Sequence, residues 1–90
     1  MYFVIHAIDR SDAGTLRGRT RPAHLDYLGG FDILFGGPML DDDGAMCGSL
    51  IVVQAEDRTA AEAFADGDPY ALAGLFETVT ITAIKPLLGI

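Results

Sequence analysis

Apolar and polar residues alternate along several short segments of this chain, which is the pattern of a half-buried β-strand. The alternation is clear over residues 2–8, where β-branched and aromatic residues surround His6 in an otherwise apolar row. It returns over residues 77–84, where threonines occupy one face and apolar residues occupy the other. These segments are predicted to be the first and last strands of a sheet.

Two further strands are predicted to form a hairpin in the middle of the chain. They cover residues 33–40, with an interruption at Gly36-Gly37-Pro38, and residues 48–54. The Asp43-Gly44 pair between them is typical of a tight hairpin turn. The aspartates of this turn are also compatible with a calcium loop, but the alternating ligand spacing and closing Glu of such a loop are missing. A turn is therefore favoured over a metal site.

A first helix is predicted from about Thr15 to the Gly29-Gly30 pair, because related residues recur at helical spacing. The positions that fall on one stripe are Arg17, Arg21, His24, Leu25 and Leu28. Pro22 interrupts this segment, since proline lacks a backbone N–H and its ring clashes with the preceding turn. Two alternatives follow: the helix kinks at Pro22, or a looser segment leads into a helix that starts there.

A second helix is predicted to open with a capping box formed by Thr59 and Glu62. Its buried stripe is expected to contain Ala60, Ala63 and Phe64.

A sharp corner follows this helix, around Asp68. Gly67 is expected to end the helix with a positive φ, and Pro69 restricts Asp68 to an extended conformation. The backbone therefore positions the Asp68 carboxylate before any partner arrives. Asp68 is an N-cap of a short helical turn or a functional group, and the two roles are compatible.

The order of elements predicts an α+β fold of the ferredoxin-like type. A β-α-β-β-α-β chain forms a four-stranded antiparallel sheet with two helices on one face, and residues 1–90 are expected to be a single domain. The other sheet face is left uncovered, and residues 85–90 form an unusually apolar tail. A homodimer or a higher even oligomer that buries this face is therefore expected.

Composition and charge exclude several classes of protein. The net charge of −7 argues against nucleic-acid binding, which needs a clustered positive surface. No apolar run approaches the length of a membrane helix, and residues 1–6 lack the features of a signal peptide. The single Cys47 cannot form an internal disulfide or a thiolate metal site. A cytoplasmic protein is expected.

The basic residues are concentrated near the first helix. Arg10, Arg17, Arg19 and Arg21 lie within twelve positions of an otherwise acidic chain. They form either a solvated helix face or a local positive potential that can attract an anionic small molecule.

Four short motifs, in this order and at these separations, resemble the YCII-related family of small proteins over nearly the whole chain. They are Arg21-Pro22-Ala23-His24-Leu25, Gly36-Gly37-Pro38, Gly48-Ser49-Leu50 and Asp68-Pro69-Tyr70. The resemblance implies a dimeric α+β barrel and a pocket lined by a His-Asp pair. This pair falls on His24 and Asp68. In one branch of the family, the pair serves to eliminate chloride from a chlorinated hydroxyquinol.

The chemistry of the two side chains agrees with that role. Histidine exchanges a proton near neutral pH, and a carboxylate on its other ring nitrogen fixes the tautomer. His24 is the predicted acid/base and Asp68 its orienting partner. Residues expected to bind the substrate are Arg21, Gly37, Pro38 and Ser49. In the alternative interpretation, His24 is simply satisfied by Asp26 or by solvent.

Other candidate residues are assigned structural roles. His6 is interpreted as a core or interface histidine, and no ligand spacing supports a metal site made of His6, His24 and Asp68. Ser49 lacks the surroundings of a serine nucleophile.

Two hypotheses for function follow. The first is a small enzyme, independent of cofactors, that performs proton transfer or elimination on an aromatic or enolic small molecule. The second is a non-catalytic module that binds a small molecule or serves in dimerisation.

Overall fold

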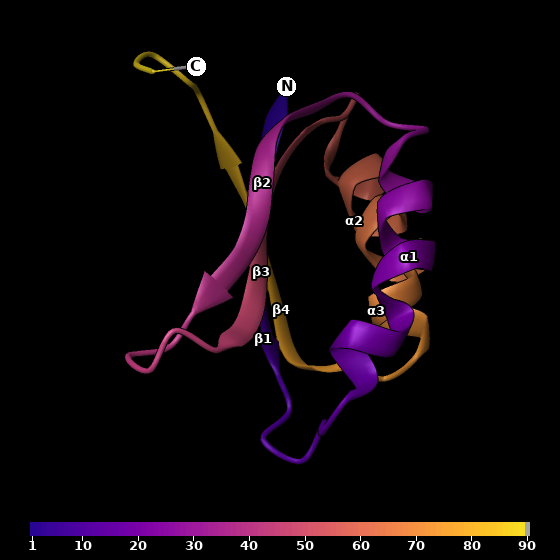
Figure 1. The fold of residues 1–90 in the computed structure, drawn as a ribbon. Helices are drawn as coiled ribbons and strands as arrows, with labels where there is room; N and C mark the ends of the chain where they lie inside the picture. Colours follow the sequence, from indigo (N-terminus) through magenta and orange to yellow (C-terminus); the bar gives the residue numbers. More distant parts are fainter. Residues whose placement is uncertain (90) are drawn as a thin grey trace.

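The computed structural model describes residues 1–89, which form an α+β fold of the ferredoxin-like type (Figure 1). Within this range the chain forms one four-stranded antiparallel sheet and three helices. In chain order the elements are β1 (Tyr2–Asp9), α1 (Leu16–Leu28), β2 (Ile33–Leu40), β3 (Met46–Gln54), α2 (Arg58–Gly67), α3 (Pro69–Leu72) and β4 (Phe76–Ile84). The predicted order is confirmed, and α3 is the helical turn expected after Asp68.

The strands lie in the order β2-β3-β1-β4, and the helices all cover one face of the sheet (Figure 1). Alternate residues of β1, such as Phe3 and Ile5, face the helices and are buried. His6 lies on the other face, opposite Leu50 of β3 and Thr80 of β4. The second face is therefore open, as the sequence predicted.

The core lies between the central strands and α2. It contains Phe3, Ile5, Ile51, Val53, Ala61, Phe64 and Ala65. The expected buried stripe of α2 is thus correct for Phe64 but wrong for Ala63, which is exposed.

The N-cap of α2 also differs from the prediction, because the Asp57 carboxylate accepts a hydrogen bond from Ala60 N at 2.8 Å. Aspartate is a strong N-cap, so the helix begins earlier, at Arg58.

Helix α1 runs without a break from Leu16 to Leu28, with Pro22 inside it. The alternative of a helix starting at Pro22 is therefore wrong. Proline has no N–H to donate to the carbonyl of Gly18, so the helix continues with one hydrogen bond missing.

Strand β2 also continues through its glycine and proline residues. The expected interruption at Gly36-Gly37-Pro38 is absent, and the register instead shifts near the two ends of the strand. Strand β2 is at the edge of the sheet, where proline is tolerated.

The predicted hairpin turn between β2 and β3 is confirmed. Gly44 has φ +83°, and the Asp41 carboxylate accepts hydrogen bonds from the N–H groups of Asp43 and Ala45.

The corner at Asp68 is built differently from the prediction. Gly67 does not have a positive φ and belongs to α2. A glycine at position 67 instead allows close packing, since an added Cβ would lie 2.6 Å from the hydroxyl of Tyr27. Asp68 is extended and accepts a hydrogen bond from Tyr70 N at 2.9 Å, with Pro69 at the first helical position. The predicted cap is therefore confirmed.

Beyond β4 the tail leaves the sheet on the side away from the helices (Figure 1). Leu87 and Leu88 are exposed there, and Ile90, the last residue of the predicted tail, lies outside the described residues. None of the helices within residues 1–89 is long and apolar enough to cross a membrane.

Candidate active site

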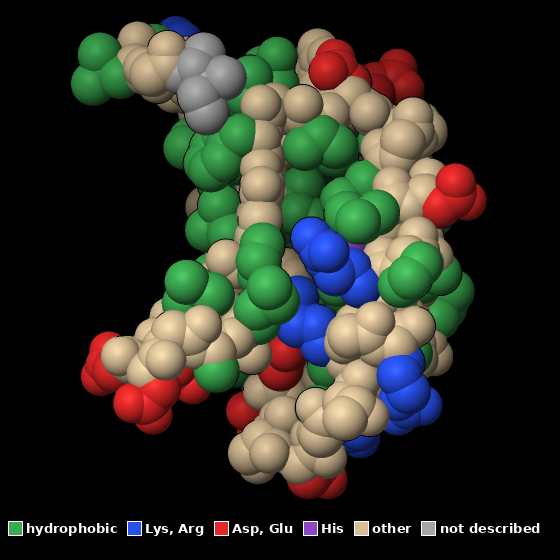
Figure 2. Space-filling view, in the orientation of Figure 1, with side chains coloured by type: hydrophobic (Ala, Val, Ile, Leu, Met, Phe, Trp, Pro, Cys, Tyr) green, Lys and Arg blue, Asp and Glu red, His purple; other side chains and the backbone are tan. Residues whose placement is uncertain are grey.

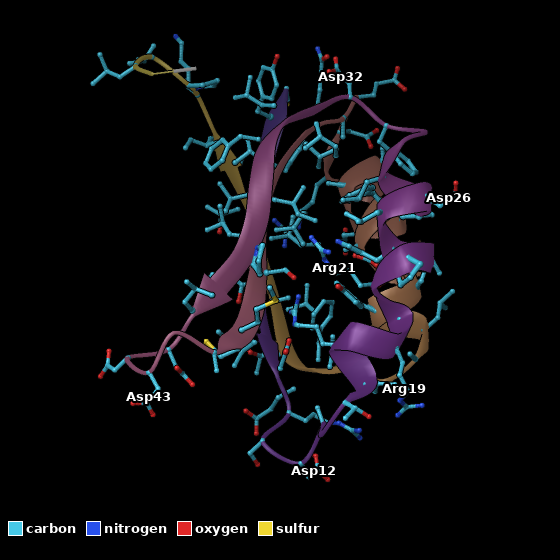
Figure 3. The ribbon with its side chains drawn as sticks, viewed as in Figure 1. Asp12, Arg19, Arg21, Asp26, Asp32 and Asp43 are labelled. Carbon is cyan, nitrogen blue, oxygen red and sulfur yellow. The ribbon has the colours of Figure 1, made fainter. Side chains whose placement is uncertain are left out.

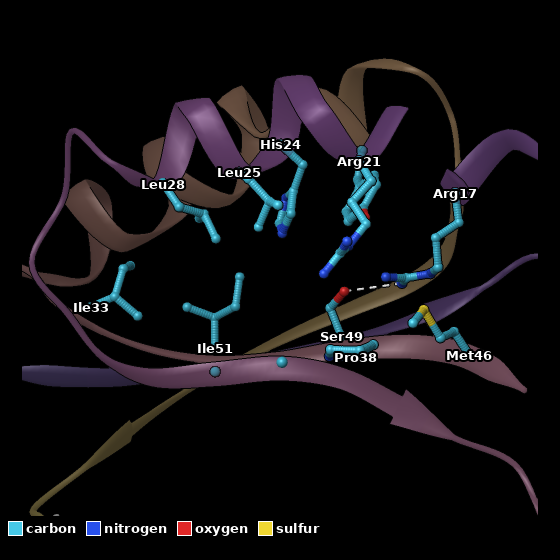
Figure 4. Close-up of a pocket in the computed structure, with 13 residues that line it drawn as sticks. Arg17, Arg21, His24, Leu25, Leu28, Ile33, Pro38, Met46, Ser49 and Ile51 are labelled. Atoms are coloured by element: carbon cyan, nitrogen blue, oxygen red, sulfur yellow. Dashed lines mark hydrogen bonds between the residues drawn. The ribbon is translucent and has the colours of Figure 1, made fainter. Parts of the chain in front are cut away.

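A pocket of about 200 Å³ lies between α1 and the sheet (Figure 4). One wall is the predicted stripe of α1, and the opposite wall comes from β2 and β3. The lining residues are Arg17, Arg21, His24, Leu25, Leu28, Ile33, Gly36, Gly37, Pro38, Met46, Ser49, Ile51 and Tyr70. All the predicted site residues except Asp68 therefore line one pocket, and Asp68 lies behind His24.

His24 and Asp68 form a buried pair at the back of this pocket. His24 Nδ1 lies 2.8 Å from Asp68 Oδ1, and the two side chains are 8% and 6% exposed. The predicted contact is confirmed, and the alternative partner Asp26 is exposed on α1. An ionised carboxylate only accepts hydrogen bonds, so Nδ1 is the donor in this pair, and in the neutral imidazole Nε2 then carries the lone pair.

The second ring nitrogen of His24 is available to a ligand. His24 Nε2 makes no hydrogen bond to any described residue, yet no fully buried side-chain nitrogen or oxygen within residues 1–89 lacks a partner. Nε2 must therefore be reached from the pocket, and Figure 4 shows the ring directed from α1 into it. A lone pair at this place can accept a proton from a bound molecule.

Arg17 is buried beside the pair and held in a fixed position. It donates two hydrogen bonds of 2.7 Å to the Asp9 carboxylate and a third, of 3.0 Å, to Ser49 Oγ (Figure 4). Burial opposes the guanidinium charge, but the bonds and charge of Asp9 outweigh burial and raise the pKa of Arg17. Arg17 is thus an anchored residue whose charge is balanced by Asp9.

The bond between Arg17 and Asp9 was not predicted from the sequence. Both explanations offered for the arginine cluster treated its members alike. The available signal was that Asp9 continues the inward-facing row of Phe3, Ile5 and Ala7, directly before the helix that carries Arg17.

Arg21 has a different environment from the neighbouring arginines. It forms no hydrogen bond or ion pair with the described residues and points from α1 toward the sheet (Figure 3). Arg19 bonds to Thr15, and Arg10 lies 3.6 Å from Asp12. In Figure 2 some of the basic side chains gather in the hollow between sheet and helices, whereas others lie on the outer surface. Arg21 therefore supplies an uncompensated positive charge to the pocket.

Tyr70 is a further pocket residue that sequence analysis did not assign to the site. Its side chain is 2% exposed, and its ring stacks on that of His24 with centroids 3.9 Å apart. The Arg17 guanidinium carbon lies 4.7 Å from the centroid of the same ring. Burial raises the pKa of Tyr70, although the charges of Arg17 and Arg21 act in the opposite direction. Tyr70 is therefore a neutral phenol at physiological pH.

The remaining candidates have clear positions. Ser49 is buried, whereas Gly37 and Pro38 are exposed at the edge of the pocket. His6, on the open face, is remote from the pair. Within residues 1–89, no group of three or more His, Cys, Asp or Glu side chains is arranged to hold a metal ion.

Comparison with known proteins places the chain in a family. The profile of the YCII-related domain matches residues 1–85, so this chain belongs to the YCII-related family. It is 38% identical to Protein YciI of Escherichia coli O6:H1 and, equally, to Protein YciI of Shigella flexneri. Each alignment covers 94% of this chain and 97% of the relative.

Among solved structures, the chain is similar to 5-chloro-2-hydroxyhydroquinone dehydrochlorinase of Burkholderia phenoliruptrix AC1100, in complex with 2,5-dihydroxybenzoquinone. The TM-score is 0.87, the identity is 34%, and 94% of each chain is covered. A protein of Mycobacterium tuberculosis has a TM-score of 0.52 and 18% identity over 98% of this chain and 95% of its own. At that identity the second likeness shows the fold alone.

Proposed function

We propose that this protein is an enzyme, independent of cofactors, that transfers a proton on an aromatic or enolic small molecule. The observation that carries the proposal is the arrangement of His24, with Nδ1 bound to Asp68 and Nε2 left to the pocket. A carboxylate that fixes the tautomer and steadies the imidazolium is the usual support of a histidine base.

The proposed step begins with the transfer of a proton from the substrate to His24 Nε2. The electron pair left behind forms a new double bond, or rests on an adjacent oxygen. In an elimination the leaving group then departs with its bonding pair, and His24 returns its proton to solvent. Asp68 keeps its negative charge and stabilises the imidazolium while the proton is held.

The shape of the pocket suits a single ring. Leu25, Leu28, Ile33 and Ile51 provide apolar walls, and Arg21 lies at the polar end. A volume of about 200 Å³ is small, which favours a compact substrate over a polymer or a dinucleotide. The likeness to the dehydrochlorinase supports a hydroxylated ring with a leaving group as the first substrate to test.

The experiment uses 2,5-dihydroxybenzoquinone as a ring probe for binding and a chlorinated hydroxyquinol for turnover. Binding is followed by the absorbance of the probe, and turnover by the release of chloride. His24→Ala is expected to lower kcat by about 10² to 10⁴-fold, the usual contribution of a general base. Asp26→Asn is the matched control, since Asp26 is an exposed acid on the same helix, and it should leave both measurements unchanged.

The second hypothesis, a non-catalytic binding module, predicts a different result. The wild type would bind the ring probe but release no chloride, and His24→Ala would alter affinity alone. That outcome would contradict the proposed enzyme.

We also propose that the protein assembles as a homodimer through the open face of its sheet. Exposed apolar side chains there include Phe35, Ile84, Leu87 and Leu88. With Leu34, Val52, Lys85 and Pro86 they line a groove of about 310 Å³ between the sheet and the tail. A second copy of the chain would cover this surface, and sedimentation at micromolar concentration should give twice the mass of 9.6 kDa.

A further inference from the structure

The polar end of the pocket offers hydrogen-bond donors without matching acceptors. The Asp9 carboxylate is bound to Arg17, and Asp68 Oδ1 is bound to His24 and to Tyr70 N. Ser49 Oγ accepts from Arg17, so the hydroxyl hydrogen of Ser49 remains free to be donated. Such a surface is complementary to an oxygen that carries negative charge.

The Tyr70 hydroxyl belongs to this set of donors. It makes no hydrogen bond of standard geometry with the described residues, although Tyr70 is 2% exposed. Because no fully buried side-chain oxygen of residues 1–89 lacks a partner, the hydroxyl must be reached from the pocket that Tyr70 lines. Arg17 can only donate to the hydroxyl oxygen, so the hydroxyl hydrogen has no acceptor among the described residues and is available to a ligand.

The ring of Tyr70 is held in place by its neighbours. His24 stacks against it, Arg17 lies over it, and Phe76 contacts it edge to face with centroids 5.9 Å apart. The N–H of Tyr70 is bound to Asp68. The hydroxyl and the proton-accepting His24 are thus fixed relative to each other before a ligand binds, which favours a catalytic group over an adaptable surface contact.

We propose that Tyr70 is a further catalytic residue, whose hydroxyl donates a hydrogen bond to the oxyanion that develops on the substrate when His24 removes a proton. The proposal rests on the proposed function and narrows its substrate class. The substrate carries a ring or enol oxygen that becomes negative during the reaction. Arg21 and the Ser49 hydroxyl contribute to the same charge stabilisation, and no proton leaves Tyr70.

The neutral state of Tyr70 is necessary for this role, because only the phenol form has a hydrogen to donate. Burial raises the pKa of Tyr70 and maintains that form despite the charges of Arg17 and Arg21. Arg21, whose charge has no partner among the described residues, then remains available to the bound oxyanion.

The test uses two ring ligands of similar size at one pH: the 4-nitrophenolate anion, which mimics the oxyanion, and neutral 4-nitrotoluene. The variant is Tyr70→Phe, which keeps the ring and its stacking. Tyr27→Phe is the matched control, since the Tyr27 hydroxyl bonds to the Phe64 carbonyl outside the pocket. Circular dichroism verifies that each variant is folded.

We expect Tyr70→Phe to weaken 4-nitrophenolate binding about 10 to 100-fold, as for the loss of a hydrogen bond to a charged group. Binding of 4-nitrotoluene should stay within about twofold, and Tyr27→Phe should match the wild type for both ligands. Bound 4-nitrophenolate should also absorb at shorter wavelength in the wild type than in Tyr70→Phe, because a hydrogen bond localises its charge.

Two outcomes would overturn the proposal. The first is that wild type and Tyr70→Phe bind 4-nitrophenolate with equal affinity. The second is that Tyr70→Phe loses affinity equally for both ligands, which would mean that Tyr70 only forms a wall of the pocket. These outcomes are separate from failure of the proposed function. That failure would appear as no chloride release by the wild type, or as full chloride release by His24→Ala, whatever the behaviour of Tyr70→Phe.

Discussion

The two faces of the sheet use the same strands for different purposes. On the helix-covered face, charged groups are buried in matched pairs, as in Asp9 with Arg17. The open face carries the exposed threonines of β4 and, elsewhere on the sheet, exposed apolar side chains such as Phe35 and Ile84. The covered face is therefore specified by individual partners, whereas the open face offers a general apolar surface. Mutations on the two faces should differ accordingly in what they disturb.

The largest effect on stability is expected for the buried ion pair. Arg17→Met leaves the Asp9 carboxylate unpaired, so the free energy of unfolding should fall by about 3 to 5 kcal/mol. Arg10→Met is the control, because the Arg10 pair with Asp12 is exposed and should contribute less than about 1 kcal/mol. Urea unfolding of each variant measures both losses of stability. Equal losses would show that burial of the Arg17 pair is unimportant.

A charge on the open face should act on assembly instead. Phe35→Lys is expected to weaken the proposed dimer by about 100-fold, as for loss of an interface anchor. Analytical ultracentrifugation over a range of concentrations measures this. The control is Asp26→Lys, at an exposed residue of α1, and this variant should leave the dimer intact. A dimer unaffected by Phe35→Lys would place the interface elsewhere.

The pair at the back of the pocket allows a sharper test. Asp68→Asn retains an N-cap residue, so its cost in stability should be about 1 kcal/mol or less. It removes the carboxylate that selects Nδ1–H, and the single His24 tautomer should give way to a mixture. Nitrogen NMR of the imidazole reports this directly. An unchanged tautomer would mean that Asp68 serves only as a cap.

The smallest expected effect is on stability at alkaline pH. Burial raises the pKa of Tyr70 and of Tyr27 above their ordinary value of 10.0. As the pH rises, the unfolded chain loses these protons before the folded protein does. The two phenols therefore contribute to the stability of the folded protein below pH 10.0, and this contribution is lost as the pH rises through their raised pKa values. Tyr70→Phe should therefore reduce the loss of stability above pH 10.0, which urea unfolding at a series of pH values measures.

Local signals were sufficient to predict most of the fold. The alternation over β1 and β4, the Asp43-Gly44 turn and the spacing of the α1 stripe each depend on neighbouring residues. The N-cap of α2 was misplaced because Asp57 and Thr59 are both good caps, and the choice between them depends on how the helix packs.

The site was less accessible to the same reasoning. His24 and Asp68 are 44 positions apart, so their contact was predicted from family resemblance and not from spacing. Arg17 and Tyr70 were not assigned to the site, because an arginine on a helix normally faces solvent and an aromatic residue normally belongs to the core. Here the core and the pocket share a boundary, and only the three-dimensional packing shows that both residues lie on it.

The long sequence separations in the pocket also have a consequence for how the chain acquires its site. Ser49 meets Arg17 across 32 positions, and Asp68 meets His24 across 44. During synthesis, a nascent chain that has completed α1, or even the β2–β3 hairpin, still lacks the partner that orients its histidine. This pair can form only after the corner beyond α2 has emerged and docked, so we expect products truncated before Asp68 to lack it.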